Sequence, residues 1–332
     1  MRILLNEEIP VSIWKDFINL NPYGSPFQTA EYFNFYNSVP GQSAIAIAIF
    51  KNDQITALSV VTLQKECGIK SYFSKRAIIY GGPLVVDDGN GTSLNILLSE
   101  INKIIKGKAI YAETRNFFNY ERYIPLFKNA GWMYQPYLNY QLYFNNSEDI
   151  WNKFNTNRKR QIKKALKCGV ISREAQSKEE VEAYYFVLKN LYKKRIRKPL
   201  PGKKFFIELF NRQLAKIFLI HYKNRIIGGI VCPVFSKKAI YEFYVCGLDQ
   251  EYKEASPSVM ATYAAIEYAC LNGISYFDFM GAGKPDDNYG VRDFKSKFGG
   301  NIVEFGRFKK ILEPNLYNLG SAVMKAKARI KK

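Results

Sequence analysis

One pattern occurs twice along this chain of 332 residues, and it limits the possible folds more than any other feature. In each half an apolar stretch enters a short polar turn, at residues 51–54 and again at 223–225, and a second apolar stretch leaves it. Stretches joined in this way predict antiparallel strand pairs. In both halves a further strand, a helix and another strand follow the pair. The repeat therefore predicts an α/β protein with two mixed sheets flanked by helices.

The individual elements follow from hydrophobic periodicity and from the positions of glycine and proline. In the first half we expect strands at 44–50, 55–63, 77–80, 109–113 and 137–144, and helices at 93–105 and 120–130. In the second half we expect strands at 170–174, 217–222, 226–234, 238–245 and 274–280, and helices at 151–167, 178–194, 205–214 and 257–271. These elements predict a first domain at 1–148, a second, basic domain at 149–320 and a basic tail at 321–332.

The net charge of +20 is carried by the second half of the chain. Residues 1–150 hold 13 basic and 13 acidic residues, whereas residues 151–332 hold 36 basic and 16 acidic ones. A half with this excess attracts a polyanion, such as a nucleic acid, a pyrophosphate-bearing small molecule or an anionic membrane face. A basic surface that serves only solubility is the alternative.

The chain offers little for metal or histidine chemistry. Its five cysteines are scattered without metal-ligand spacing, and His221 is the only histidine. We therefore expect no zinc site, no histidine-based triad and reduced thiols. No apolar run approaches the roughly 20 residues that span a bilayer, and the acidic Glu7 and Glu8 are unlike a signal peptide. The expected protein is cytoplasmic, with no metal and no tightly bound cofactor.

The strongest candidate site lies where the predicted strand 274–280 ends in glycines at Gly281. Glycines at a strand end let a ligand or another backbone approach closely. Further along, Phe294 and Phe298 lie four residues apart and share a helical face. We expect these rings to hold Lys295, whose ammonium would stabilise a developing oxyanion or phosphate. A packed aromatic pair with solvent-facing lysines is the alternative.

Two charged residues near these segments are further candidates, Asp278 on the side of its sheet opposite its phenylalanine neighbours and Arg158 on an inward helical face. Asp278 alternates with two phenylalanines in the predicted strand, so it is either a base or one member of a pair with a basic neighbour. Arg158 falls on the apolar stripe of the predicted helix 151–167, between Phe154 and Ile162. An inward guanidinium needs either an internal carboxylate or a bound phosphate as its partner.

A third basic segment, residues 192–198, combines an aromatic residue with five positive charges and includes Arg195. Such a segment suits the phosphates of RNA or of a nucleotide-linked substrate. It also suits the negative end of a helix dipole with no ligand at all.

Together these motifs resemble the Fem family of peptidyltransferases (FemABX), over nearly the whole chain. The segments that carry the resemblance are Ser25-Pro26-Phe27-Gln28-Thr29, residues 76–85, Glu113-Thr114-Arg115-Asn116, residues 157–165 and, most specifically, residues 277–281 with Phe294-Lys295 and Phe298-Gly299. The resemblance implies two tandem halves of the GCN5-related acetyltransferase (GNAT) fold. It also implies transfer of amino acids from aminoacyl-tRNA to peptidoglycan precursors.

The resemblance further implies roles for single residues. Lys295 would lie nearest the chemistry with Phe294 beside it, as the catalytic residues. Arg158, Tyr244 and Tyr289 would help to hold the acceptor or the donor. The strand-exit Gly281 and the basic-segment residue Arg195, chosen above from the residues themselves, complete the predicted substrate-binding set. An acceptor amine would attack the donor ester, and the lysine would stabilise charge on the tetrahedral intermediate or on the leaving ribose. The acceptor would be a nucleotide- or lipid-linked precursor, with tRNA as a possible partner.

Two alternatives remain at this stage. One is an acyl-CoA-dependent N-acyltransferase acting on an amino sugar, although the segment 247–258 lacks the glycine-rich loop that cradles CoA pyrophosphate at a helix start. The other is a non-catalytic protein that binds RNA or a membrane surface. The basic tail, which includes Lys325 and Lys327, would suit the anionic inner face of a membrane, where the protein could be peripheral.

Overall fold

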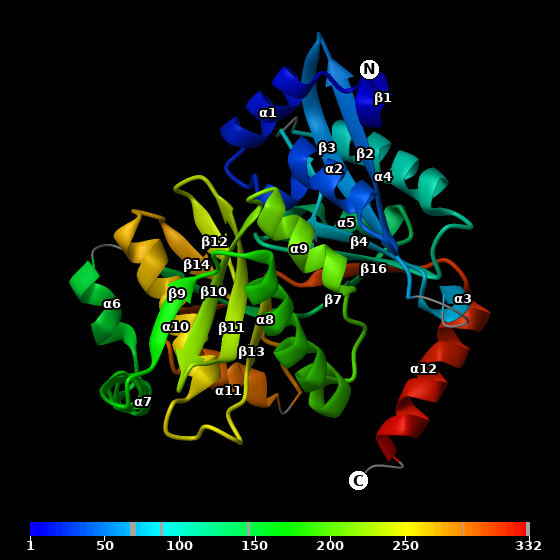
Figure 1. The fold of residues 1–332 in the computed structure, drawn as a ribbon. Helices are drawn as coiled ribbons and strands as arrows, with labels where there is room; N and C mark the ends of the chain where they lie inside the picture. The colour runs from blue at the N-terminus through cyan, green and yellow to red at the C-terminus, as the bar shows by residue number, and fades with distance from the viewer. Residues whose placement is uncertain (67–70, 87–88, 145–146, 288, 330–332) are drawn as a thin grey trace. The chain divides into compact units, whose positions relative to one another are not determined.

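The computed structural model describes residues 1–66, 71–86, 89–144, 147–287 and 289–329 (Figure 1). The chain divides into two compact units. The first unit comprises Met1–Pro136 and Phe305–Lys332, and the second comprises Tyr137–Glu304. Each unit contains one mixed sheet with helices packed on it, which confirms the predicted α/β class and the duplication.

The first unit is built on an eight-stranded sheet in the order β1-β2-β3-β4-β6-β16-β7, with β5 paired to β3. Its strands are β1 Arg2–Leu5, β2 Gln42–Lys51, β3 Gln54–Gln64, β4 Arg76–Gly81, β5 Leu84–Val85, β6 Tyr111–Asn116, β7 Met133–Gln135 and β16 Arg307–Ile311. Its helices are α1 Val11–Leu20, α2 Ala30–Ser38, α3 Ser71–Ser74, α4 Thr92–Ile105, α5 Ile124–Asn129 and α12 Pro314–Arg329, with short 3-10 turns at Asn6–Glu8, Pro26–Gln28 and Glu121–Tyr123.

The second unit repeats this order as β9-β10-β11-β12-β14-β8-β15, with β13 paired to β11. Its strands are β8 Leu138–Tyr143, β9 Ile171–Glu174, β10 Ala215–Tyr222, β11 Arg225–Phe235, β12 Ala239–Tyr241, β13 Tyr244–Gly247, β14 Tyr276–Asp278 and β15 Asn301–Glu304. Its helices are α6 Ser147–Lys153, α7 Thr156–Lys167, α8 Lys178–Leu191, the π-helical η5 Tyr192–Ile196, α9 Lys203–Asn211, α10 Pro257–Leu271 and α11 Gly290–Ser296.

Two strands belong to a sheet that their place in the sequence does not indicate. β8 pairs with β14 and β15 in the second sheet, and β16 pairs with β6 and β7 in the first. The predicted domains at 1–148 and 149–320 instead place β8 in the first half and β16 in the second. The alternation of 137–144 predicts a strand but does not indicate its partner, because that partner is more than a hundred residues away.

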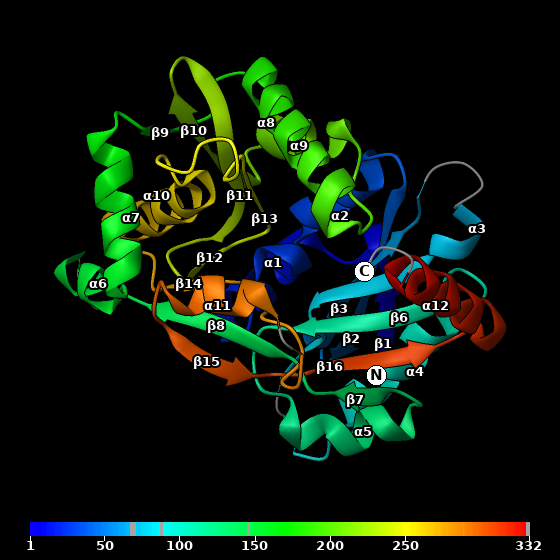
Figure 2. The same ribbon diagram turned by 90° about the horizontal axis from the view of Figure 1, so that it is seen from below.

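The layers of the second unit place its site. α8 and α9 cover one face of the sheet, and α10 lies on the other with α7 beside it (Figure 2). α10 is rich in alanine and buried along most of its length, so it can lie close to β10 and β11. Its contacts with the sheet form the core, together with Phe277, Phe279 and Phe298.

The predicted strand 238–245 is interrupted in the structure. β12 pairs with both β11 and β14, whereas β13 continues along β11. The two strands part at Glu242 and Phe243, and we call this point the second split. The first unit has the same break between β4 and β5, at Gly82 and Pro83, which we call the first split. The second split is where the candidate site lies.

Candidate functional site

The second sheet opens just beyond its last hydrogen bond between β12 and β14. The Glu242 amide donates this bond to the Asp278 carbonyl at 2.9 Å. After β14 the backbone turns sharply, because Met280 and Gly281 both take positive φ angles, 55° and 113°. A non-glycine residue such as Met280 in this region carries strain of about 1 kcal/mol or more, which is common at functional sites.

Lys295 of α11 lies in this opening, at the strand exit that the sequence indicates. Its side chain is only 8% exposed. The ammonium donates to the carbonyl of Phe279, to that of Gly281 at 2.9 Å, and to Glu242 Oε1 at 3.0 Å. An ammonium has three N–H donors, so these three acceptors satisfy it. The charge is therefore buried and fixed where the pairing between β12 and β14 ends.

The expected aromatic clamp around Lys295 is wrong in its partner. Its ammonium lies over the ring of Phe279, at 5.8 Å. Phe294 and Phe298 pack on each other at 5.5 Å and enclose the guanidinium of Arg158 instead, at 4.5 and 4.2 Å. Adjacent helical residues point about 100° apart, so Lys295 and Phe294 face different neighbours.

Glu242 is the member of the site that sequence reasoning missed. Its side chain is 2% exposed and accepts from the Thr262 hydroxyl of α10 at 3.2 Å, besides its ion pair with Lys295. Burial raises the pKa of Glu242 above its ordinary value, and the nearby Lys295 opposes that rise. The available signal was a single acid in the otherwise apolar stretch 239–247, since such a residue needs a buried partner.

Arg158 faces inward as predicted, but its contacts are not those expected. Its side chain is 2% exposed and donates to Gln161 Oε1 at 2.8 Å and to the Phe294 carbonyl at 2.7 Å. Its Nε has no hydrogen-bond partner among the described residues. Burial lowers the pKa of Arg158 to about 10. Neither a carboxylate nor an open phosphate site meets this guanidinium in the described structure, and what it braces is α11.

Asp278 is bonded to amides, where the sequence pointed to a base or a pair with a basic residue. Its carboxylate accepts from Asn139 at 2.9 Å, from Gln141 at 3.0 Å and from the Met280 amide at 2.7 Å. Burial raises the pKa of Asp278. These bonds tie the exit of β14 to its neighbour β8, which fixes the strand end beside Lys295.

The remaining predicted residues lie at different distances from the split. Gly281 is part of it, and its amide donates to Asn139 Oδ1 at 2.7 Å. Tyr289 precedes α11 and packs its ring against Gly283, where an added Cβ would lie 2.7 Å from it. Tyr244 opens β13 among aromatic rings, the nearest being that of Phe243 at 4.7 Å. Arg195 is exposed on η5.

The N-terminus of α10 follows β13, where an acetyltransferase would bind a pyrophosphate. Here it is capped internally, because Asp249 accepts from the Ser258 amide at 3.0 Å and from the Ser258 hydroxyl. Gly247 lies against the same turn, so that an added Cβ would lie 2.4 Å from the Ser258 nitrogen. Pro257 at the first helical position offers no N–H. Protein atoms thus already occupy this anion position.

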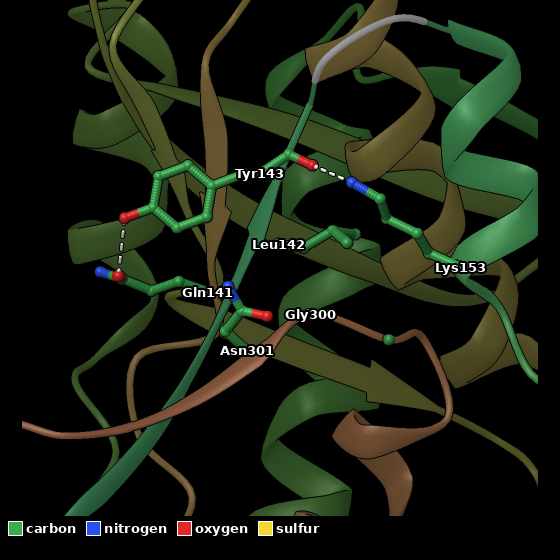
Figure 3. A pocket seen from close by; sticks show the side chains of 7 residues that line it. Gln141, Leu142, Tyr143, Lys153, Gly300 and Asn301 are labelled. Atoms are coloured by element: carbon green, nitrogen blue, oxygen red, sulfur yellow. Dashed lines mark hydrogen bonds between the residues drawn. The ribbon is translucent and has the colours of Figure 1, made fainter.

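A hollow of about 250 Å³ lies beside β8, lined by this strand and by the start of β15 (Figure 3). Lys153 donates to the Tyr143 carbonyl at 2.9 Å, and the Tyr143 hydroxyl donates to Gln141 Oε1 at 3.1 Å. Gln141 also bonds Asp278, so a chain of hydrogen bonds connects the hollow to the end of β14. The other lining residues are Leu142, Gly299, Gly300 and Asn301.

Three further features bear on the predicted chemistry. Among the described residues no group of three or more His, Cys, Asp or Glu side chains could hold a metal. The cysteines in the described ranges are free, and Cys67 lies outside those ranges. In the part of the chain that the structure describes, no helix combines the length and apolar character that crossing a membrane requires.

Comparison with known proteins fits this geometry. Residues 152–296 match the sequence model of the acetyltransferase (GNAT) domain family, a range that includes both the second split and Lys295. The matched range covers most of the second unit, and this similarity supports an acyltransferase. No curated protein matches the chain by sequence.

Solved structures extend the likeness to both units. FemX shares 16% identity and a TM-score of 0.71, over 96% of this chain and 99% of its own. A tandem GNAT protein from the clavulanic acid biosynthesis pathway shares 8% identity and a TM-score of 0.58, over 93% and 98%. A C-terminal domain from Agrobacterium fabrum, named for a lysylphosphatidylglycerol synthetase, shares 10% identity and a TM-score of 0.56, over 96% and 95%. In fold the chain is a Fem-like protein with two GNAT halves.

Proposed function

We propose that this protein transfers an aminoacyl group from an activated ester to an amine of a cell-envelope precursor. The observation that carries the proposal is the buried ammonium of Lys295, held where β12 and β13 part in a GNAT domain. Buried cations fixed in advance at such a point stabilise the negative charge that develops during acyl transfer. The likeness of the fold to FemX agrees with an acceptor in the cell envelope.

The proposed step is a simple exchange of bonds. The acceptor nitrogen attacks the ester carbonyl carbon, a C–N bond forms, and the carbonyl oxygen gains negative charge in the tetrahedral intermediate. The C–O bond to the leaving group then breaks. The attacking nitrogen loses a proton and the leaving oxygen gains one, so the overall reaction yields an amide and an alcohol. The contribution of Lys295 is to stabilise the oxyanion or the leaving oxygen.

Because its three donors are occupied, Lys295 must exchange one acceptor for the substrate oxygen. We propose that the Gly281 carbonyl gives way. Releasing a neutral carbonyl costs less than separating the charged Glu242 from the ammonium. Glycine at φ 113° also allows a peptide rotation that a side chain would hinder.

The capped start of α10 supports an aminoacyl-tRNA ester as the donor. The carboxylate of Asp249 occupies the helix N-terminus that would otherwise receive the CoA pyrophosphate. Residues 151–332 hold 36 basic and 16 acidic residues, and this excess of positive charge also suits a large polyanion. On α7, Arg160, Lys163 and Lys164 are exposed and provide part of that charge. Acyl-CoA remains the alternative donor, because it is the usual one for the GNAT fold.

The acceptor class that we propose is a nucleotide-linked or lipid-linked precursor carrying a free amine. The C-terminal domain named above for a lysylphosphatidylglycerol synthetase shares the fold, and the lipid in that name supports the lipid-linked arm of this proposal. A cytoplasmic protein that touches the inner face of the membrane would meet either form. The basic helix α12, whose last turns overlap the predicted tail, is the segment proposed for that contact.

The test is a transfer assay with a mixed pool of radiolabelled aminoacyl-tRNAs and, in parallel, labelled acetyl-CoA. Each donor is offered UDP-linked and lipid-linked peptide acceptors. We expect label to move from aminoacyl-tRNA to one acceptor, and Lys295→Met to lower kcat by 10²–10³-fold. Lys297→Met, at the residue that follows α11, is the matched control, because this lysine is 33% exposed. Transfer from acetyl-CoA alone would support the alternative donor, and undiminished transfer by Lys295→Met would remove the proposed mechanism.

A further inference from the structure

The first unit provides an internal reference for the second split. Its sheet opens in the same way, with β4 paired to β6 and β5 paired to β3. There Tyr120 lies in the opening, and its one O–H is shared between the Pro83 carbonyl at 2.7 Å and the Gly81 carbonyl at 3.0 Å. Tyr120 is 1% exposed and uncharged. A neutral phenol is therefore enough to close such a split.

The second split is closed by two opposite charges instead. The Lys295 and Glu242 side chains are 8% and 2% exposed, so both ions lie out of water. Burying an ion pair is often no better for stability than a well-packed neutral group, because desolvation opposes the attraction. Since the first unit shows a neutral solution to the same packing problem, stability alone does not account for the pair.

We propose that Glu242 is a positioning residue that holds the ammonium of Lys295 in its reactive place during acyl transfer. This inference rests on the proposed function. Glu242 leaves β12 at the split, and the Thr262 hydroxyl fixes its second oxygen. With its carboxylate anchored to α10, Glu242 keeps Lys295 in the opening when the substrate oxygen replaces the Gly281 carbonyl. Without that anchor the ammonium would follow the exchanged carbonyl or leave the opening.

The surroundings of Glu242 make its charge sensitive to acid. Lys295 faces it from α11 and Arg158 acts on it from α7, whereas Asp278 of β14 adds negative charge and Cys232 of β11 lies near it. Burial, the largest influence, raises the pKa of Glu242. Protonation below that raised pKa leaves Lys295 without its anionic partner. The activity that depends on the pair is therefore present at higher pH and lost as the pH falls through this titration.

The kinetic test uses Glu242→Gln, which keeps the shape and removes the charge. We expect kcat to fall at least 10-fold while KM changes less than twofold, and the acid limb of the kcat profile that belongs to Glu242 to disappear. Glu242→Asp should restore part of the activity and the acid limb. Glu267→Gln, an exposed carboxyl on α10, is the control. An acid limb that is unchanged in Glu242→Gln would overturn the proposal.

A second measurement needs no substrate. In protein labelled with ¹³C at the lysine ε-carbon, the Lys295 resonance is assigned by its loss in Lys295→Arg. We expect it to shift as the pH falls through the titration of Glu242, and to stay constant in Glu242→Gln. A constant resonance in the native protein would overturn the positioning role even if transfer occurs. A shifting resonance together with full transfer by Lys295→Met would instead contradict the proposed function.

Discussion

The two sheets use the same strand order but place charge differently on their central strands. Glu113 of β6 and Asp278 of β14 occupy equivalent positions in the two sheets. Glu113 lies opposite Lys309 of β16, and Asp278 lies opposite Gln141 of β8. Asp278 is held by the neutral amides of Asn139 and Gln141 on β8. Glu113 is held by cations on β16, with Arg307 at 2.9 Å and Lys309 at 3.7 Å.

At the splits the arrangement is reversed. The first unit places neutral Tyr120 in its opening, and the second places the Lys295–Glu242 pair there. The comparison teaches that a GNAT-like half needs a polar group at the split but not a charge. The unit that keeps a charge there is the one in which we place the chemistry, and the measurements below are designed to break or sharpen that contrast.

The largest expected effect follows from emptying each split in turn. Glu242→Ala leaves the Lys295 ammonium buried without its counter-ion and should destabilise the second unit by about 3–5 kcal/mol. Tyr120→Phe removes the one O–H that the Gly81 and Pro83 carbonyls share and should cost about 1–2 kcal/mol. Urea unfolding monitored separately in each unit by hydrogen exchange measures both. Equal losses of unfolding free energy in the two variants would mean that the buried ion pair of the second split matters no more to stability than the neutral phenol of the first.

The next effect concerns the backbone of the first split. Gly82 has a φ of 75°, and an added Cβ would lie 2.2 Å from the Tyr120 hydroxyl. Gly82→Ala should therefore cost about 3 kcal/mol, from left-handed strain and from displacing the ring. Gly107 has a similar φ of 71° with nothing within 4 Å. Gly107→Ala therefore measures the backbone strain alone, about 1–2 kcal/mol. Equal shifts in melting temperature for the two variants would contradict the claim that Tyr120 fills the first split.

A smaller effect is the response of the two central strands to acid. Burial raises the pKa of Glu113, but attraction to Arg307, Arg115 and Lys309 outweighs it, so the pKa lies below the ordinary value for a glutamate. Its stabilisation is present above the unfolded value and is lost as the pH falls through the folded pKa.

Asp278 has a raised pKa, so its protonation favours the folded second unit as the pH falls. Between pH 6 and pH 3, exchange protection of β6 should drop relative to that of β14. The difference should be on the order of 1 kcal/mol. Glu113→Gln should remove the part that comes from β6, and the part that comes from Asp278 should remain. Protection that falls equally in both strands would show that the central carboxyls do not differ.

The smallest effect is the loss of the Asp249 cap. Asp249→Ala frees the Ser258 amide and should lower the stability of the second unit by about 1 kcal/mol. The native protein should show no melting shift with millimolar CoA, since the carboxylate already occupies the helix start. Glu251→Ala, in the same loop, is the control. A CoA-dependent rise in the melting temperature of the native protein would contradict the proposed donor class.

Much of this architecture could be predicted from the sequence. The polar turns at 51–54 and 223–225 lie between paired strands, because turn chemistry and apolar alternation are local. Lys295 and Gly281 are brought together at a strand exit as expected. The pairings of β8 and β16 could not be predicted, since a strand pattern does not name its distant partner.

The details of the site show the same limit. Glu242 gave only the weak signal of an acid among apolar residues, and its partner is 53 positions away in the sequence. The spacing of Phe294 and Phe298 predicts a clamp around Lys295, which lies between them in the sequence. In the structure they enclose Arg158 instead, which comes from a different helix. Local spacing indicates which face a residue lies on, and only packing decides what that face meets.

The most direct test compares the two splits in one reaction. Single-turnover transfer is measured for the native protein, Lys295→Met and Tyr120→Phe, each shown to be folded. Lys295→Met should lose 10²–10³-fold in the rate of the chemical step, and Tyr120→Phe should stay within about threefold of the native protein. Loss of transfer in Tyr120→Phe with full transfer in Lys295→Met would contradict the assignment of the chemistry to the second unit.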